Sequence, residues 1–165
     1  MTVEAGQLRS LLRSHASGVA VLTAEGVAGP AGVTITTFTS ISAKPALVSF
    51  ALAETSNTWE QIKDNQWFGV QLLGTHQESL AQRFATPGAD RFAPPTSWRR
   101  SPQGVPLLDG CLCWLVCSRH SHVRLGDHHL VVGAVEHVEQ GVPGDNLLHL
   151  HGRLLSPFST APTRS

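Results

Sequence analysis

The feature that most constrains the fold of this chain is a series of strand-like segments with little helical sequence between them. Segments rich in β-branched and apolar residues recur along the chain, separated by glycine, proline and polar residues. No regular alternation of strand and helix is present, as a parallel α/β sheet would require. We therefore expect a mainly β fold, a barrel or sandwich decorated by a few short helices. The expected strands are residues 19–23, 33–42, 46–52, 67–73, 111–119, 130–139 and 147–155.

Short helices and loops are expected between these strands. Residues 4–15 carry leucines at helical spacing and predict an amphipathic helix. Glycine and proline predict a turn over 25–32, and 86–109 holds five of the ten prolines and predicts a long loop. Two more helices are expected at capping boxes, in which a capping residue precedes Glu by three positions: Asn57 with Glu60, and Thr75 with Glu78.

Composition limits the class of protein and its partners. The 165 residues fit one domain, which we place at 1–155, followed by a loose tail at 156–165. Twelve basic residues balance twelve acidic ones, so no excess positive charge supports nucleic-acid binding. No segment has the length and apolarity of a signal peptide or membrane span. The three clustered cysteines do not suggest a secreted disulfide framework, and we expect a cytoplasmic protein.

The cysteine cluster is the strongest candidate for a metal site that the residues offer. Its ligand types suit zinc, but the spacing differs from the C-x2-C of zinc ribbons and fingers. If the segment is a strand, the cysteines share one face with Leu115, and packing in the interior explains them. We therefore expect no bound metal, with a zinc-stabilised interaction module kept as an alternative. The residues concerned are Cys111, Cys113, Cys117, His120 and His122.

Five stretches, taken in order, resemble the flavin reductase-like family from about Leu8 to Leu155. The resemblance implies an FMN-binding split β-barrel (Greek-key) with short flanking helices. It also implies an NAD(P)H:flavin oxidoreductase that uses FMN or FAD and NADH or NADPH, forms a homodimer, and supplies reduced flavin to a partner monooxygenase. The stretches are 16–23 (ASGVAVLT), 32–42 (GVTITTFTSIS), 44–48 (KPALV), 68–73 (FGVQLL) followed by Gln77, Leu80, Ala81, Arg83, Phe84 and Ala85, and 126–133 (GDHHLVVG).

The resemblance also implies candidate site residues. Backbone N–H groups and hydroxyls of the second stretch would bind the flavin ring, with Phe38 packing against it. A helix opening would receive the flavin phosphate. Because the family often has Arg where Asn57 stands, Arg83 is the expected source of positive charge. The expected cofactor-binding residues are Thr34, Thr36, Thr37, Phe38, Ser40, Ser42, Ser56, Asn57, Thr58 and Arg83.

His128 is the expected catalytic residue. It occupies the family's Gly-Asp-His position, where it would orient the reduced cofactor by hydrogen bonding while Asp127 fixes its tautomer. The last strand departs from the family pattern Leu-Tyr-x-x-Gly-x-Tyr, because residues 148–154 read LHLHGRL and the chain contains no tyrosine. That departure keeps open a flavin- or haem-binding split-barrel protein without reductase activity.

Overall fold

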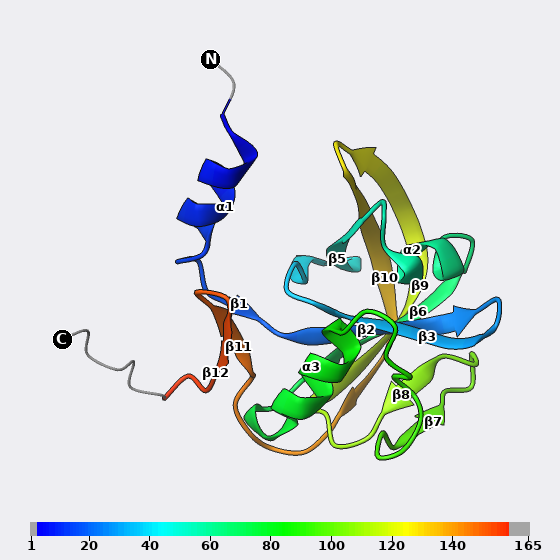
Figure 1. Ribbon diagram of the computed structural model, residues 1–165. Helices are drawn as coiled ribbons and strands as arrows, with labels where there is room; N and C mark the ends of the chain where they lie inside the picture. Colours follow the sequence, from blue (N-terminus) through cyan, green and yellow to red (C-terminus); the bar gives the residue numbers. More distant parts are fainter. Residues whose placement is uncertain (1–2, 159–165) are drawn as a thin grey trace.

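The computed structural model describes residues 3–158 and shows the mainly β architecture that the sequence predicts (Figure 1). The elements, in chain order, are α1 (Ala5–Leu12), β1 (Ser17–Gly18), β2 (Ala20–Gly26), β3 (Gly29–Ile35), β4 (Thr39–Ala43), β5 (Ala46–Ala53), α2 (Asn57–Ile62), β6 (Trp67–Leu72), the 3-10 turn η1 (Thr75–Gln77), α3 (Glu78–Ala85), β7 (Trp98–Arg100), β8 (Pro106–Leu108), β9 (Cys113–Leu125), β10 (His128–Gln140), β11 (Leu148–Leu150) and β12 (Arg153–Leu155).

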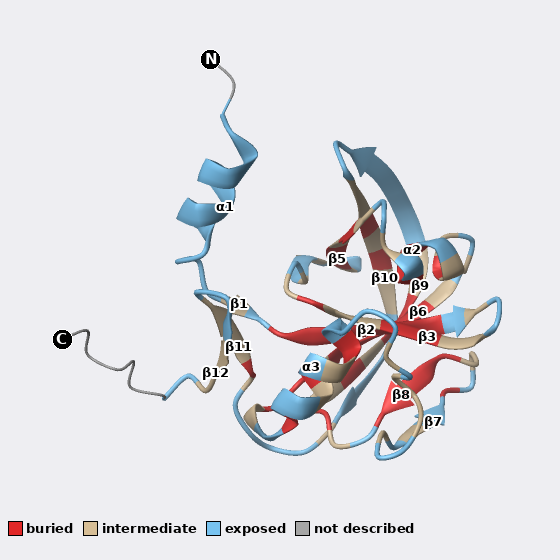
Figure 2. Cartoon of the chain, viewed as in Figure 1, coloured by how far each residue is buried: buried red, intermediate tan, exposed pale blue. Residues whose placement is uncertain are grey.

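The core lies on both faces of one antiparallel sheet. Its seven strands run in the order β3-β2-β6-β9-β10-β5-β4. Alternate residues of β2 point to opposite faces, so Leu22 joins one buried cluster with Phe50, and Val21 joins a second with Phe84. Figure 2 shows this interior in red, with α3, β7 and β8 over the second cluster. Burial on both faces explains why β2 reads as a continuous apolar run.

The expected strand over 33–42 is wrong in its middle, because the chain changes edges of the sheet there. β3 ends at Ile35 and β4 begins at Thr39, and these two strands are the opposite edges. Between them, the Thr37 hydroxyl accepts a hydrogen bond from Ala51 N (2.9 Å) and donates one to Ala51 O (3.0 Å). This side chain therefore replaces a backbone partner beside β5.

The predicted turn over 25–32 and the predicted strand over 147–155 also differ from the structure. The turn expected over 25–32 is confined to residues 27–28, because Pro30 lies on the edge strand β3, where a missing N–H is tolerated. The strand expected over 147–155 is instead a hairpin of β11 and β12. Its turn residues His151 and Gly152 have φ angles of 52° and 75°, the left-handed conformation of a tight hairpin turn.

The predicted helices and the predicted loop are also adjusted. Ser56, rather than Asn57, caps α2, and its Oγ accepts a hydrogen bond from Trp59 N (3.3 Å). The 3-10 turn η1 precedes α3, so Thr75 does not cap that helix. The loop expected over 86–109 contains the paired strands β7 and β8. Of the tail expected at 156–165, residues 159–165 lie outside the described part.

Two parts of the chain project from the main body (Figure 1): α1, and the outer half of the β9–β10 hairpin, in which β10 stays paired with β5 from His128 to Ala134. α1 stands apart as an arm in which no residue is buried, and it is pale blue throughout in Figure 2. The outer half of the β9–β10 hairpin projects beyond β6, which pairs with β9 only up to Ser118. Within residues 3–158, no helix has the length and apolarity needed to cross a membrane.

Candidate functional site

A cavity of about 610 Å³ opens beside the start of α2, and we call it the α2 cavity. Its walls come from β3, from the turn that begins α2, and from the loop after α3. Its lining includes Gly32, Ser56, Asn57, Thr58 and Arg91. Three segments that are distant in sequence therefore converge here, and the predicted residues Ser56, Asn57 and Thr58 lie together as expected from their adjacency.

Arg91 fixes one wall of the α2 cavity. Its Nη1 donates to Gly32 O and to Thr58 Oγ1 (3.1 Å), and its Nη2 donates to Thr86 O (3.1 Å). Its Nε is buried and has no hydrogen-bond partner among the described residues. Burial lowers the pKa of Arg91 below its usual value, because the charged form loses hydration. Nη2 makes only one of its two possible hydrogen bonds, and a cation fixed in this way is a preformed partner for an anion.

The other polar groups of the α2 cavity are mostly donors. Ser56 Oγ accepts from Trp59 N, so its own O–H remains available, and the first N–H groups of α2 have no carbonyl ahead of them in the helix. Among the described lining residues, the only carboxylate belongs to Asp90, whose Oδ1 accepts a hydrogen bond from Ala93 N (3.2 Å). This donor set fits a phosphate.

Gly32 allows β3 to pack closely against α3 at this wall. A Cβ atom at this position would lie 2.8 Å from Phe84 Cε1 and 3.0 Å from Leu22 O, too close for either contact. The absence of a side chain therefore sets the position of the carbonyl that anchors Arg91.

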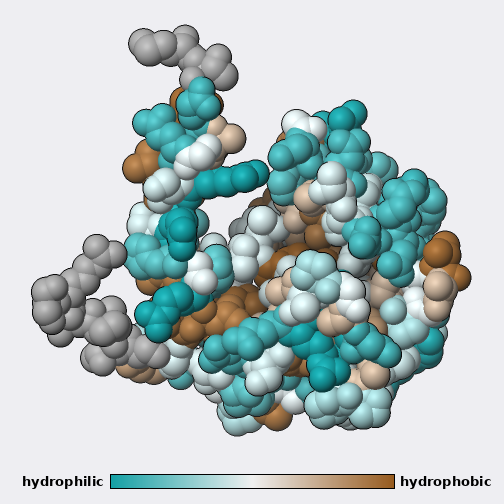
Figure 3. Space-filling model, in the orientation of Figure 1, coloured by the Kyte–Doolittle hydropathy of each residue, from teal (hydrophilic) through white to brown (hydrophobic). Residues whose placement is uncertain are grey.

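A second cavity of about 730 Å³ lies between α1 and the segment that connects β3 to β4, and we call it the arm cavity. Figure 3 shows apolar surface exposed in the hollow between the arm and the body. The base of the arm is tethered by two hydrogen bonds, from Arg13 Nη2 to His151 O and from His151 N to Arg13 O. The lining includes the predicted residues Thr36, Thr37 and Phe38, together with Arg9, His15 and His149.

The remaining predicted cofactor-binding residues line neither cavity. Thr34 Oγ1 donates to Ala81 O (2.7 Å), and Ser42 Oγ accepts from Lys44 N (3.2 Å). Ser40 is exposed on the edge strand β4. Arg83 Nη1 donates to three loop carbonyls, of Asp90, Ala93 and Pro94. In the described structure, Arg83 therefore orders the loop that carries Arg91.

His128 lies at the tip of the β9–β10 hairpin. Its Nδ1 is 2.7 Å from Asp127 Oδ1, and a hydrogen bond donated by Nδ1 leaves Nε2 as an acceptor in the neutral ring. The hydrogen bond and the charge of His128 hold the pKa of Asp127 below its ordinary value, and Arg9 of α1 lowers it further. Asp127 O accepts from Glu54 N (2.9 Å), so the tip is attached to the chain segment between β5 and α2.

Two of the three cysteines are buried, one in each core cluster, and the third, Cys113, is half-buried at the start of β9. Cys117 packs with Leu115 as expected, but Cys111 lies before β9 and packs in the other cluster with Trp114, so the expected common face is wrong for it. Burial raises the pKa of Cys111 and of Cys117 to about 12, so both stay protonated at neutral pH. Across residues 3–158, no group of three or more His, Cys, Asp or Glu side chains is arranged to hold a metal ion.

Arg91 is the residue of the α2 cavity that the sequence analysis did not identify. It lies in the proline-rich loop, 59 positions from the Gly32 carbonyl that it binds. The available signal was a cation between Asp90 and Phe92 in a loop without periodicity. That signal does not distinguish a binding residue from an ordinary surface cation.

Comparison with known proteins gives consistent matches. The flavin reductase like domain matches residues 12–156. An NADH:FMN oxidoreductase of Rhodococcus qingshengii is 42% identical over 134 residues, which are 81% of this chain and 70% of that protein. A reductase subunit of a flavin-dependent monooxygenase of Rhodococcus jostii is 30% identical over 162 residues, which cover 97% of this chain and 83% of that subunit.

The solved structures include a match over the whole chain. The NADH:FAD oxidoreductase of Streptomyces globisporus, in complex with NAD and FAD fragments, has a TM-score of 0.86 and 28% identity, and the match covers 100% of this chain and 99% of that one. The match confirms the expected split-barrel fold.

Proposed function

The chain belongs to the flavin reductase-like domain family, and we propose that it is an NADH-dependent flavin reductase whose α2 cavity holds the flavin phosphate. It transfers a hydride from NADH to FMN or FAD and is the reductase component of a two-component monooxygenase, as similar proteins are. The observation that carries the assignment of the site is the half-buried Arg91, whose guanidinium is fixed by three hydrogen bonds beside Ser56, Asn57 and Thr58.

The residues of the two cavities have separate tasks in this proposal. Bound flavin and nicotinamide supply the hydride chemistry themselves, so the protein needs no nucleophile. Arg91 would neutralise the phosphate charge, and the Ser56 hydroxyl, the Asn57 side-chain amide and the first backbone N–H groups of α2 would donate hydrogen bonds to the phosphate oxygens. The Thr58 hydroxyl itself donates to Gly32 O and accepts from Arg91. Thr36 and Phe38, farther along the same segment as Gly32, would offer a hydroxyl and an apolar face to the ring.

His128 would act by orientation rather than by proton transfer. Asp127 accepts from Nδ1, so Nε2 of the neutral ring can accept a hydrogen bond from a carboxamide. The contact between Asp127 O and Glu54 N holds the hairpin tip close to the start of α2. His128 would thus place the nicotinamide end of the donor, which raises the fraction of productive encounters.

The enzymatic proposal is tested with the purified chain, NADH and added flavin. We expect NADH oxidation that requires FMN or FAD and exceeds the rate with free flavin alone. Flavin binding without NADH turnover would instead support a cofactor-binding protein that lacks reductase activity. No flavin binding and no turnover would contradict the assignment altogether.

We also propose that the chain forms a homodimer in which a second copy covers α1. An isolated helix of eight residues is not stable in water, and α1 buries none of its residues. Leu8, Leu11 and Leu12 are 49%, 68% and 57% exposed, and the arm cavity borders the same helix. A second copy would bury these leucines and close the cavity at the same time.

A cytoplasmic location completes the proposal. The three cysteines form no disulfide, as is usual in a reducing compartment. In the cytoplasm the protein would also have access to NADH and to a partner oxygenase. Fractionation of the cells that make the protein would test this location, and recovery outside the cytoplasmic fraction would contradict it.

A further inference from the structure

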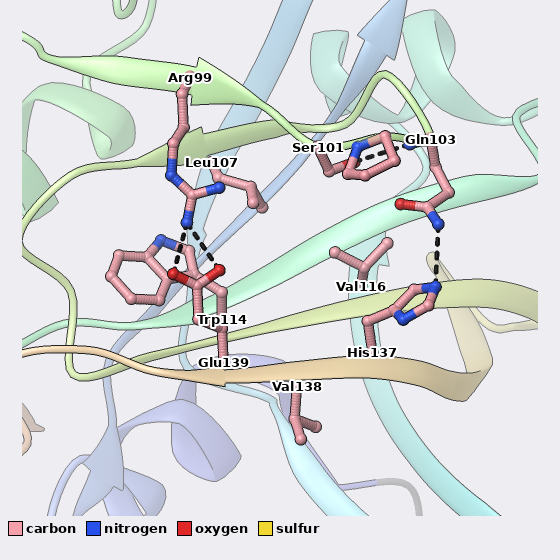
Figure 4. Close-up of a pocket in the computed structure, with 10 residues that line it drawn as sticks. Arg99, Ser101, Gln103, Leu107, Trp114, Val116, His137, Val138 and Glu139 are labelled. Atoms are coloured by element: carbon pink, nitrogen blue, oxygen red, sulfur yellow. Dashed lines mark hydrogen bonds and ion pairs between the residues drawn. The ribbon is translucent and has the colours of Figure 1, made fainter.

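A third cavity, of about 220 Å³, lies between β7–β8 and the inner half of the β9–β10 hairpin, and we call it the Trp114 pocket (Figure 4). Leu107, Trp114 and Val116 form its apolar floor, and each is at most 8% exposed. None of its lining residues lines the α2 cavity or the arm cavity. The pocket therefore plays no part in the site proposed for the flavin.

Arg99 provides the main charge at the rim of the Trp114 pocket. Its Nη2 donates to both carboxylate oxygens of Glu139 at 2.8 Å, and its guanidinium carbon lies 5.4 Å from the centre of the Trp114 ring. Nε and Nη1 make no hydrogen bond to the described residues. Their three N–H groups, one on Nε and two on Nη1, therefore stay available. Figure 4 shows the second terminal nitrogen of Arg99 on the side of Leu107.

Ser101 and His137 also line the Trp114 pocket, and each has one hydrogen-bond donor left. Ser101 Oγ accepts hydrogen bonds from Gln103 N (3.2 Å) and Val105 N (3.1 Å), so its O–H is free to donate. His137 Nε2 lies 2.9 Å from the Gln103 amide nitrogen, which can only donate. The neutral His137 ring therefore carries its proton on Nδ1. Gln103 Oε1 is buried and unpartnered in the described structure.

We propose that the Trp114 pocket binds a small aromatic carboxylate. An aromatic ring fits against the indole and the aliphatic floor, and the free N–H groups of Arg99 with the Ser101 O–H suit a carboxylate. Because Glu139 pairs with Arg99, the rim carries no net charge, and the carboxylate would be held by hydrogen bonds from the free N–H groups of Arg99. The volume is below the range of drug-sized ligand sites, which excludes a nucleotide or a flavin.

The probe is benzoate, titrated calorimetrically into the full chain, with benzamide as its neutral counterpart. We expect saturable binding of one benzoate per chain, and binding of benzamide at least ten-fold weaker. Arg99→Gln should weaken benzoate binding by about ten-fold or more, because it removes a charge-assisted hydrogen bond. The matched control is Arg100→Gln, since Arg100 is the next residue, pairs with Glu25 and lies outside the pocket. It should leave the affinity unchanged.

A second measurement locates the bound probe. The indole N–H resonance of Trp114, assigned with Trp114→Phe, should shift during the benzoate titration, because the ring forms the pocket floor. The absence of saturable benzoate binding would overturn the proposal. Equal affinity in Arg99→Gln and the unmodified chain, or displacement of benzoate by FMN, would also overturn it, because binding would then lie elsewhere.

Discussion

The α2 cavity and the arm cavity border the two ends of one segment, residues 32–38, but they are built in different ways. The walls of the α2 cavity belong to the packed sheet, where Thr58 is 3% exposed and Arg91 is held by three hydrogen bonds. The outer wall of the arm cavity is α1, in which no residue is buried. One cavity is therefore formed within a single chain, and the other depends on what covers the arm.

This difference separates two requirements of a flavin reductase. Affinity for a phosphate benefits from donors that are fixed before binding, because no ordering cost is then paid on binding. A site that must admit and release two cofactors benefits from a wall that is attached loosely, as α1 is through Arg13 and His151. Under the proposed assignment, the phosphate anchor and the entrance for the cofactors lie at opposite ends of the same segment.

The largest expected effect contrasts the sheet with the arm. Phe84 is fully buried behind Gly32, so Phe84→Ala should lower the free energy of unfolding by about 3–5 kcal/mol at any protein concentration. Leu11→Ala should lower the free energy of unfolding by less than about 0.5 kcal/mol in dilute solution, where the chain is a monomer. The loss should be larger at high protein concentration, where a second copy covers α1. Chemical denaturation at two protein concentrations measures both. Equal losses in the dilute protein would contradict the contrast.

A charge on the arm should break the proposed dimer. Leu11→Asp would place a carboxylate in the covered face of α1, which should weaken association by about 100-fold. Sedimentation analysis measures the dissociation constant. The control is Val27→Asp, because Val27 is 91% exposed at the β2–β3 turn, and it should leave association intact. A monomer in the unmodified chain would refute the dimer.

How far the sequence predicts this molecule depends on the distance between interacting residues. The apolar run of β2 and the cluster of Ser56, Asn57 and Thr58 are local patterns, and both were predicted. The contact between Arg91 and Gly32 joins positions 59 apart and has no local signal. The break between β3 and β4 was missed for a related reason: residues 33–42 favour a strand throughout, and only the arrangement of the sheet decides where that strand must end.

A smaller effect is expected at the segment between the two cavities. Thr37→Val removes the hydroxyl that bonds both backbone groups of Ala51, which should cost about 1 kcal/mol of stability and raise the KM for flavin. Thr39→Val is the control for stability, since that hydroxyl makes one long contact of 3.5 Å to its neighbour's carbonyl. Unchanged stability and kinetics in Thr37→Val would remove Thr37 from this account.

The smallest effect concerns pH at the hairpin tip. His128 lowers the pKa of Asp127, so this contact stabilises the fold above the unfolded-state pKa of Asp127 and is lost as the pH falls through the lower folded-state value. His128→Gln should therefore raise the pKa of Asp127 toward its ordinary value, as followed by carboxyl-carbon NMR. His120→Gln, on the same hairpin, should not. A lowered pKa that persists in His128→Gln would assign the shift to another group.

The central claim is that Arg91 holds the flavin phosphate in the α2 cavity, and the most direct test compares FMN with riboflavin, which lacks the phosphate. In the unmodified chain, FMN should bind at least ten-fold more tightly than riboflavin, since a charge-assisted hydrogen bond contributes about 1.5–3 kcal/mol. Arg91→Met should remove most of this difference while riboflavin affinity stays the same, and Arg91→Lys should keep part of it. If Arg91→Met still prefers FMN as strongly as the unmodified chain does, the phosphate lies elsewhere and the account is wrong.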